Sequence, residues 1–147
     1  MAKFTTKVFA KLKNIPQPES AALLNAPVDV DFPAANYSVG DIIEVVEVPP
    51  GVVAQDWSIH FPDIDTNATP TLAFSFGLLN AASTDLAAVY AAGLIAGQSN
   101  AVVRNPNTDT AQADSTVARR LGLKVTAAAA TYAGAGKTGQ ILFDLRG

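Results

Sequence analysis

The most constraining feature of the sequence is a pair of apolar runs on either side of a Pro-Pro-Gly turn at residues 49–51. The first run, residues 41–48 (DIIEVVEV), is rich in β-branched side chains and carries apolar ones at both odd and even positions, as in a strand covered on both faces. The second run, residues 53–61, alternates, and its buried face is expected to carry Val53, Gln55, Trp57, Ile59 and Phe61. Together the two runs predict a β-hairpin.

Three further segments have the two-residue period of strands. Their expected buried faces carry Leu72, Phe74 and Phe76, then Leu121, Leu123, Val125 and Ala127, and finally Ile141, Phe143 and Leu145. The glycine-rich segment between the last two predicts a closing hairpin, and residues 101–104 predict a short strand beside an exposed loop. The sequence therefore predicts an all-β chain, folded as an antiparallel, jelly-roll-like β-sandwich.

Residues 83–97 predict one short helix within this β pattern. Leu86, Val89, Tyr90, Gly93 and Leu94 recur at helical spacing, and a preceding Ser or Thr is suited to cap the first turn.

The N-terminal part has a different composition. Residues 1–38 contain four prolines and predict an extended arm with one helical turn at residues 20–24, whereas residues 39–147 form the sandwich domain. The first thirteen residues carry Lys3, Lys7, Lys11 and Lys13 and no acidic residue, although the net charge of the chain is −3. Such an arm either docks on an acidic surface or is a solvated terminus, and the sequence leaves both open.

Composition excludes several kinds of site. The chain has no cysteine, which rules out disulfides, thiolate zinc sites and a cysteine nucleophile. No apolar run reaches the 18 or so residues of a membrane span, and the lysines near the start argue against a secretion signal, so a soluble protein without a membrane partner is expected.

Motifs that resemble active sites are incomplete. Gly136, Lys137 and Thr138 would end a phosphate-binding loop, but its first glycine falls on Thr131, so a turn with Lys137 in solvent is expected. The only histidine, His60, is expected on a strand surface, too far from Ser58 for a direct hydrogen bond.

Two other groups of polar residues have simpler explanations. Asp63, Asp65 and Asn67 match the start of a calcium loop but lack its glycine and glutamate, which favours a turn. Arg119 and Arg120 indicate either an ion-pair site across an interface or an exposed pair. No catalytic residue, metal site or cofactor is predicted.

One combination of motifs resembles a known family. The chain carries Gly40-Asp41-Ile42-Ile43, then Val48-Pro49-Pro50-Gly51-Val52, residues 123–130 rich in alanine, and the closing segment 139–145. This order, over roughly residues 39–147, resembles tailed-bacteriophage virion proteins of the capsid decoration (cement) or head-fibre type.

The resemblance implies a structural, non-enzymatic protein on the outer surface of a phage head. Its expected partners are the major capsid protein and further copies of itself, as a homotrimer, with no nucleic acid. We expect Lys3, Lys7, Lys11 and Lys13 to contact the capsid, and Ile43, Val45, Arg119 and Arg120 to lie in the oligomer interface, because the strand at 42–48 has more apolar surface than a one-sided sheet needs. The alternative is a carbohydrate- or host-receptor-binding module of a fibre or tail, which requires an exposed aromatic side chain beside Asp, Asn or Gln.

Overall fold

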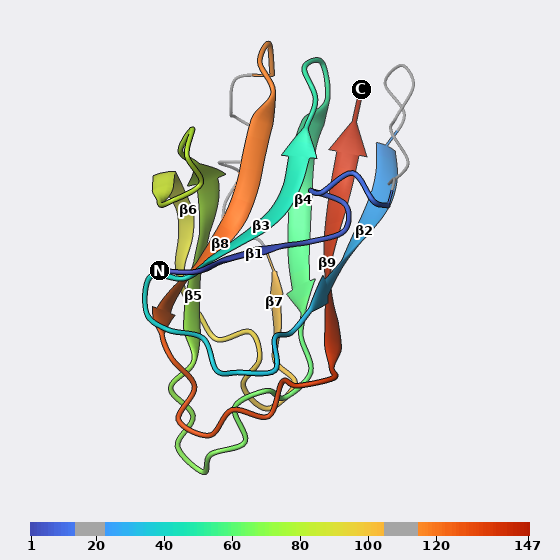
Figure 1. Ribbon diagram of the computed structural model, residues 1–147. Helices are drawn as coiled ribbons and strands as arrows, with labels where there is room; N and C mark the ends of the chain where they lie inside the picture. The colour runs from blue at the N-terminus through green and yellow to red at the C-terminus, as the bar shows by residue number, and fades with distance from the viewer. Residues whose placement is uncertain (14–22, 105–114) are drawn as a thin grey trace.

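The computed structural model describes residues 1–13, 23–104 and 115–147, and within these ranges every regular element is a β-strand. The strands are β1 (Lys3–Thr5), β2 (Leu23–Asp31), β3 (Ile42–Val48), β4 (Val53–His60), β5 (Ala73–Leu79), β6 (Leu86–Leu94), β7 (Val102–Arg104), β8 (Arg119–Ala127) and β9 (Thr138–Arg146). A five-stranded sheet has the order β1-β3-β8-β5-β6, and a four-stranded sheet has the order β2-β9-β4-β7. All pairs are antiparallel except β1 with β3. The predicted all-β sandwich is confirmed (Figure 1).

The hydrophobic core lies between the two sheets. The faces predicted for β5, β8 and β9 are confirmed except at Ala127, which is only partly buried: the buried residues are Leu72, Phe74, Phe76, Leu121, Leu123, Val125, Ile141, Phe143 and Leu145. The Trp57 ring lies with its centroid 4.5 Å from that of Phe76, which joins β4 of one sheet to β5 of the other. The strand aromatics are therefore core residues, as expected.

A β-bulge in β4 changes the face that the alternation predicts. Ala54 pairs with Leu145 and Asp56 with Asp144, so Gln55 is an extra residue without a partner in the register. Ala54 is buried and Gln55 is exposed. The prediction that Gln55 shares the buried face was wrong, because a bulge shifts the alternation of side chains by one residue.

Neither predicted hairpin forms. β3 pairs with β8 and β4 pairs with β9, so the Pro-Pro-Gly turn connects strands of opposite sheets. The glycine-rich segment 131–137 likewise connects β8 of one sheet to β9 of the other. Both predictions were wrong because a two-residue period identifies the buried face of a strand but not its hydrogen-bonded neighbour.

The predicted helix is strand β6. Its pairing with β5 contains three register shifts, each with one more residue on β6 than on β5. Consequently Ala88, Ala91 and Leu94, which pair with Leu78, Phe76 and Phe74, follow one another at three-residue intervals. Repeated bulges interrupt the two-residue alternation along β6, so its sequence lacks the period that is typical of strands.

The sandwich includes two strands from the range that the sequence assigned to an arm. β1 pairs with β3, and β2 pairs with β9 over its whole length. Pro27 is accommodated because β2 is an edge strand, where a missing N–H need not interrupt the ladder. Of the helical turn predicted at residues 20–24, residues 20–22 lie outside the described residues, and Leu23 and Leu24 begin β2.

Candidate functional site

The four N-terminal lysines all contact the chain itself. Lys3 Nζ donates to the Ala82 carbonyl at 3.1 Å, and the Lys7, Lys11 and Lys13 ammonium groups lie 3.5, 3.6 and 2.6 Å from Asp31, Glu47 and Asp29. The side chains of Lys7 and Lys11 remain 65% and 68% exposed. Exposed ion pairs contribute about 0–1 kcal/mol each, so a partner can replace these contacts at a small cost in free energy. Their contact with a capsid stays a prediction.

The N-terminal segment also closes one side of the sandwich. Thr6 Oγ1 donates to the Val45 carbonyl at 2.5 Å, and Val8 is buried in the core. The Phe4 ring packs edge-on against Tyr37 with a centroid distance of 5.1 Å. With Lys7 and Lys13 paired to β2, residues 3–13 bridge the edge strands of the two sheets.

The residues predicted for an oligomer interface are buried or hydrogen-bonded within the single chain. Ile43 and Val45 are 1% and 0% exposed, so most of the apolar surface of β3 is covered without a second copy. Arg119 is buried and donates from Nη2 to the carbonyls of Pro49 and Val52. Arg120 Nη2 donates to the carbonyls of Asn80 and Ala81, each at 2.6 Å. Their role between copies stays a prediction.

The outer face of the five-stranded sheet is covered by the loop at residues 80–85. Besides Lys3 and Arg120, the loop is held by Lys124, whose Nζ lies 2.7 Å from Asp85 Oδ1. Ile42 and Leu79, outside the central core cluster, are nevertheless buried. This face is therefore occupied by the chain.

The outer face of the four-stranded sheet carries a row of polar side chains. The register aligns Asp29 with Gln140, Gln140 with His60, and His60 with Val102 across all four strands. Gln140 Nε2 donates to Asp29 Oδ1 at 3.0 Å, and hydrogen bonds from Lys13 and Gln140 lower the pKa of the Asp29 carboxyl group.

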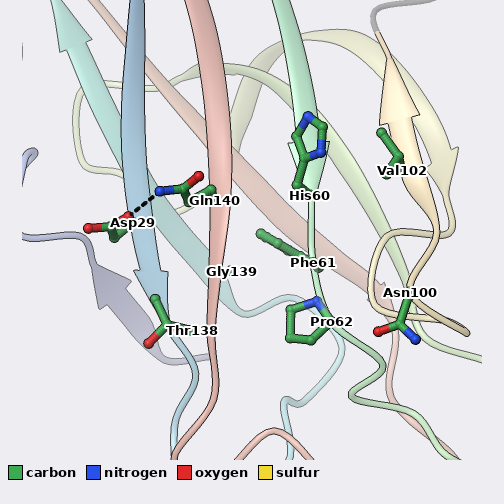
Figure 2. A pocket seen from close by; sticks show the side chains of 9 residues that line it. All are labelled: Asp29, His60, Phe61, Pro62, Asn100, Val102, Thr138, Gly139 and Gln140. Carbon is green, nitrogen blue, oxygen red and sulfur yellow. Dashed lines mark hydrogen bonds between the residues drawn. The ribbon is translucent and has the colours of Figure 1, made fainter.

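A hollow of about 480 Å³ lies on this face, beside the row that contains His60. Asp29, Gln140 and Thr138 line one side, and His60, Val102 and Asn100 line the other (Figure 2). A second hollow of about 170 Å³ is lined by His60 together with Asn25, Asp56, Ser58, Arg104, Leu142 and Asp144. His60 lines both hollows, and we refer to the two together as the groove along β4 and β9.

Ser58 and His60 meet inside this groove. The Ser58 hydroxyl oxygen lies 2.8 Å from His60 Nε2, so the prediction that the two are too far apart was wrong. A catalytic pair of this kind also needs a group that orients the imidazole. Among the described residues no carboxylate is hydrogen-bonded to His60, so the pair alone does not make a catalytic triad.

Asp65 is the most connected carboxylate of the loops at one end of the sandwich. Although only 1% exposed, it accepts N–H bonds from Thr71 and Leu72 at 2.7 and 3.0 Å, and from Ala130 and Thr131 at 3.1 and 2.9 Å. Burial alone raises the pKa of this carboxyl group, but the four backbone donors outweigh burial and lower the pKa to about 2. Asp65 therefore has a structural role, which agrees with a turn rather than a calcium loop.

Lys137 belongs to the same loop cluster. Its ammonium group donates to the Asp63 carbonyl at 2.6 Å and the residue is only partly exposed, so the expectation that it lies in solvent was wrong. Within the described residues the structure has no group of three acidic or histidine side chains placed to hold a metal ion. The same part of the chain contains no helix able to cross a membrane.

The sequence and the fold were compared with those of known proteins. No family model matches the sequence, and no curated protein matches it. The structure is similar to a chain of "Capsid of Ralstonia phage GP4", with a TM-score of 0.80 and 25% identity over 98% of this chain and 97% of that chain. The chain thus has the fold of a phage capsid chain.

A second solved structure shares the fold. A chain of "Cyanophage Pam1 capsid asymmetric unit" matches with a TM-score of 0.59 and 20% identity, over 92% of this chain and 93% of that chain. Neither description names the role of the matched chain within its capsid. The predicted relation to phage virion proteins is confirmed at this coarser level, as structural similarity to phage capsid chains.

Proposed function

We propose that the protein is a capsid decoration (cement) protein, which binds the outer surface of a phage head, stabilises it and performs no catalysis. The observation that carries the proposal is the similarity to a chain of the Ralstonia phage GP4 capsid, because it extends over almost the full length of both chains. The matched chain is therefore about as small as this one, as expected of a separate capsid component rather than of a domain within a large shell protein.

The surface of the molecule supports binding rather than chemistry. The N-terminal lysines sit on the outside of the sandwich, and each is held by a weak contact that a partner can replace. In this proposal Lys3, Lys7, Lys11 and Lys13 contact acidic groups of the major capsid protein. The protein assembles as a homotrimer, since a trimer fits a local threefold position of a capsid lattice.

The alternative of a carbohydrate- or receptor-binding module is less well supported. That function requires an exposed aromatic ring beside hydrogen-bonding side chains. All eleven aromatic residues lie in the described part of the chain, and each is buried or only partly exposed, including Tyr37, Tyr90 and Tyr132. The groove on the four-stranded sheet has hydrogen-bonding groups but no aromatic platform.

The test is co-sedimentation with undecorated capsids, together with the native mass of the purified protein. We expect a homotrimer that pellets with capsids and saturates at a fixed ratio to the major capsid protein. A variant with Lys7, Lys11 and Lys13 changed to Gln should keep the fold and bind more weakly, most clearly at low salt. A wild-type protein that stays in the supernatant at all concentrations contradicts the proposal, and binding to glycans instead favours the alternative.

A further inference from the structure

The two outer sheet faces of the sandwich differ in how the chain covers them. On the five-stranded sheet, residues 80–85 cover the surface and bury Ile42 and Leu79. On the four-stranded sheet, the outward side chains of β9 and β4, such as Gln140 and Asp56, are exposed. Lys7 and Lys13 reach the β2 margin of this second face through their ion pairs with Asp31 and Asp29.

The open face has the shape of a shallow channel. The hollows of about 480 and 170 Å³ adjoin at His60 and extend from Pro62 and Asn100 at one end to Asp56 and Asp144 at the other. Residues 56–62 of β4 and its continuation span this length. At about 3.3 Å per residue, the channel accommodates roughly six residues of extended chain.

The charges of this face are arranged for cations. At the β2 margin, Asp29 and Asp31 each already bind an ammonium group of the chain's own N-terminal segment, Lys13 at 2.6 Å and Lys7 at 3.5 Å. Further along the channel, Asp56 and Asp144 lie directly opposite each other in the β4–β9 register. Neither forms an ion pair with any described cation, Arg104 included, although Arg104 lines the same hollow.

This opposed pair is unfavourable in the isolated chain. Like charges directly opposite each other destabilise an antiparallel sheet, and a cation placed between them removes the repulsion. The same face binds lysines at Asp29 and Asp31, so a lysine or arginine from outside the chain meets equivalent chemistry at Asp56 and Asp144. Asn25 Nδ2 donates to Asp144 Oδ1 and Gln140 Nε2 donates to Asp29 Oδ1, each at 3.0 Å, so the second N–H and the C=O of each amide are what an extended backbone can meet.

We propose that the outer face of the four-stranded sheet is a docking surface for an extended basic segment of a capsid subunit, with a lysine or arginine seated between Asp56 and Asp144. This inference rests on the proposed function and names the surface through which it acts. The acidic groove and the lysines at its β2 margin then form one continuous contact face of mixed charge.

The test compares two variants that remove one carboxylate each. Asp56 Oδ1 accepts the N–H of Trp57 at 2.8 Å, and Asp85 Oδ1 accepts the N–H of Leu86 at the same distance. Asp85→Asn is therefore the control from the other sheet, with the difference that Asp85 is also paired with Lys124. We expect Asp56→Asn to weaken capsid binding severalfold and the double variant D56N/D144N to weaken it about tenfold or more at low salt, while D85N stays within twofold. The double variant should be at least as stable as the wild type, because it loses the repulsion between the two carboxylates.

A second measurement is independent of capsids. A six-residue lysine peptide, added to the labelled full-length protein, should shift the amide resonances of Ser58, His60 and Gln140 in the wild type but not in D56N/D144N. Absence of these shifts in the wild type overturns the docking surface.

The capsid assay separates the two proposals. If the wild type binds capsids and D56N/D144N binds equally well, the docking surface is wrong and the decoration function stands. If the wild type does not bind capsids, the decoration function fails, whatever the peptide does. A double variant that changes the native mass but not capsid binding shows that the face lies between copies of the protein, which also overturns the inference.

Discussion

At the scale of single residues, Asp65 shows most clearly how a polar side chain fixes the loops of this fold. Its two oxygens accept four N–H bonds from two separate segments, residues 71–72 and 130–131. We predict that Asp65→Asn lowers the free energy of unfolding by about 2–4 kcal/mol, because the amide group then faces backbone donors with a donor of its own. Asp63→Asn is the control, since that side chain accepts a single long hydrogen bond, from the Ser99 N–H at 3.2 Å. Chemical denaturation should show little change in the free energy of unfolding of this variant.

The protonation of Asp65 gives a pH-dependent form of the same prediction. Its pKa in the folded chain is about 2, below the ordinary value of 3.8. The carboxylate therefore contributes its full stabilisation above about pH 4, and the contribution, about 2 kcal/mol, is lost as the pH falls from 4 to 2. The difference in unfolding free energy between wild type and Asp65→Asn should shrink over this window, and a constant difference contradicts the proposed charge.

The sequence pointed to Asp65 only as part of a turn. Its backbone donors include Thr71 and Ala130, which lie 6 and 65 residues from Asp65 in the sequence. Only the fold brings these three residues together. The pairing of Ser58 with His60 was missed for a related reason, since strand spacing describes the backbone and not how far side chains lean toward each other. The bonds from Ala130 and Thr131 to Asp65 join distant segments of the chain, whereas Ser58 and His60 lie two residues apart on one face of β4.

At the scale of secondary-structure elements, the N-terminal segment is part of the sandwich. The sequence indicated an extended arm, but Val8 is buried in the core and Thr6 bonds to β3. We predict that deleting residues 1–13 lowers the free energy of unfolding by about 3 kcal/mol or more, since burial of a valine alone contributes roughly 1.5–3 kcal/mol. Thermal unfolding of the truncated chain measures this.

The triple variant of Lys7, Lys11 and Lys13 to Gln is the control for the deletion. It keeps the backbone of the segment and removes only exposed ion pairs, so its stability should stay within about 1 kcal/mol of the wild type. If the deletion variant and the triple variant have the same free energy of unfolding, the N-terminal segment does not close the sandwich as described.

The sequence predicted β3, β4, β5, β7, β8 and β9 as strands, but it did not predict β1, β2 or β6, nor how the strands pair. The alternation of Phe74 and Phe76, or of Ile141 and Phe143, reflects one buried face, which is a local property. Phe143 pairs with Trp57 of β4 and not with a residue of β8, the strand that precedes β9 in the sequence, and this choice depends on contacts across the whole chain. Bulges weaken even the local signal, as the helix-like spacing of β6 demonstrates.

At the scale of the whole molecule, the candidate function could be anticipated only in outline. The motifs that begin at Gly40-Asp41 resemble those of virion proteins, and the full-length similarity to a phage capsid chain supports that view. The groove on the four-stranded sheet could not be anticipated, because it is built from β2, β4, β7 and β9, whose order the sequence does not specify.

A decoration protein should make the filled head more resistant to heat. A ligand that binds only the intact lattice stabilises it by RT ln(1 + [L]/Kd) per site, about 2.7 kcal/mol at a concentration one hundred times the Kd. We therefore predict that the temperature at which DNA leaves undecorated heads rises as this protein is added. Dye access to the packaged DNA during heating measures the release.

The rise should level off when the sites are full, at the same ratio at which co-sedimentation saturates. The D56N/D144N variant, which keeps the sandwich but lacks the acidic pair, should need a higher concentration to reach the same release temperature. If wild-type protein saturates the capsid and the release temperature does not change, the protein binds the head without stabilising it, and the cement role is excluded while surface attachment remains.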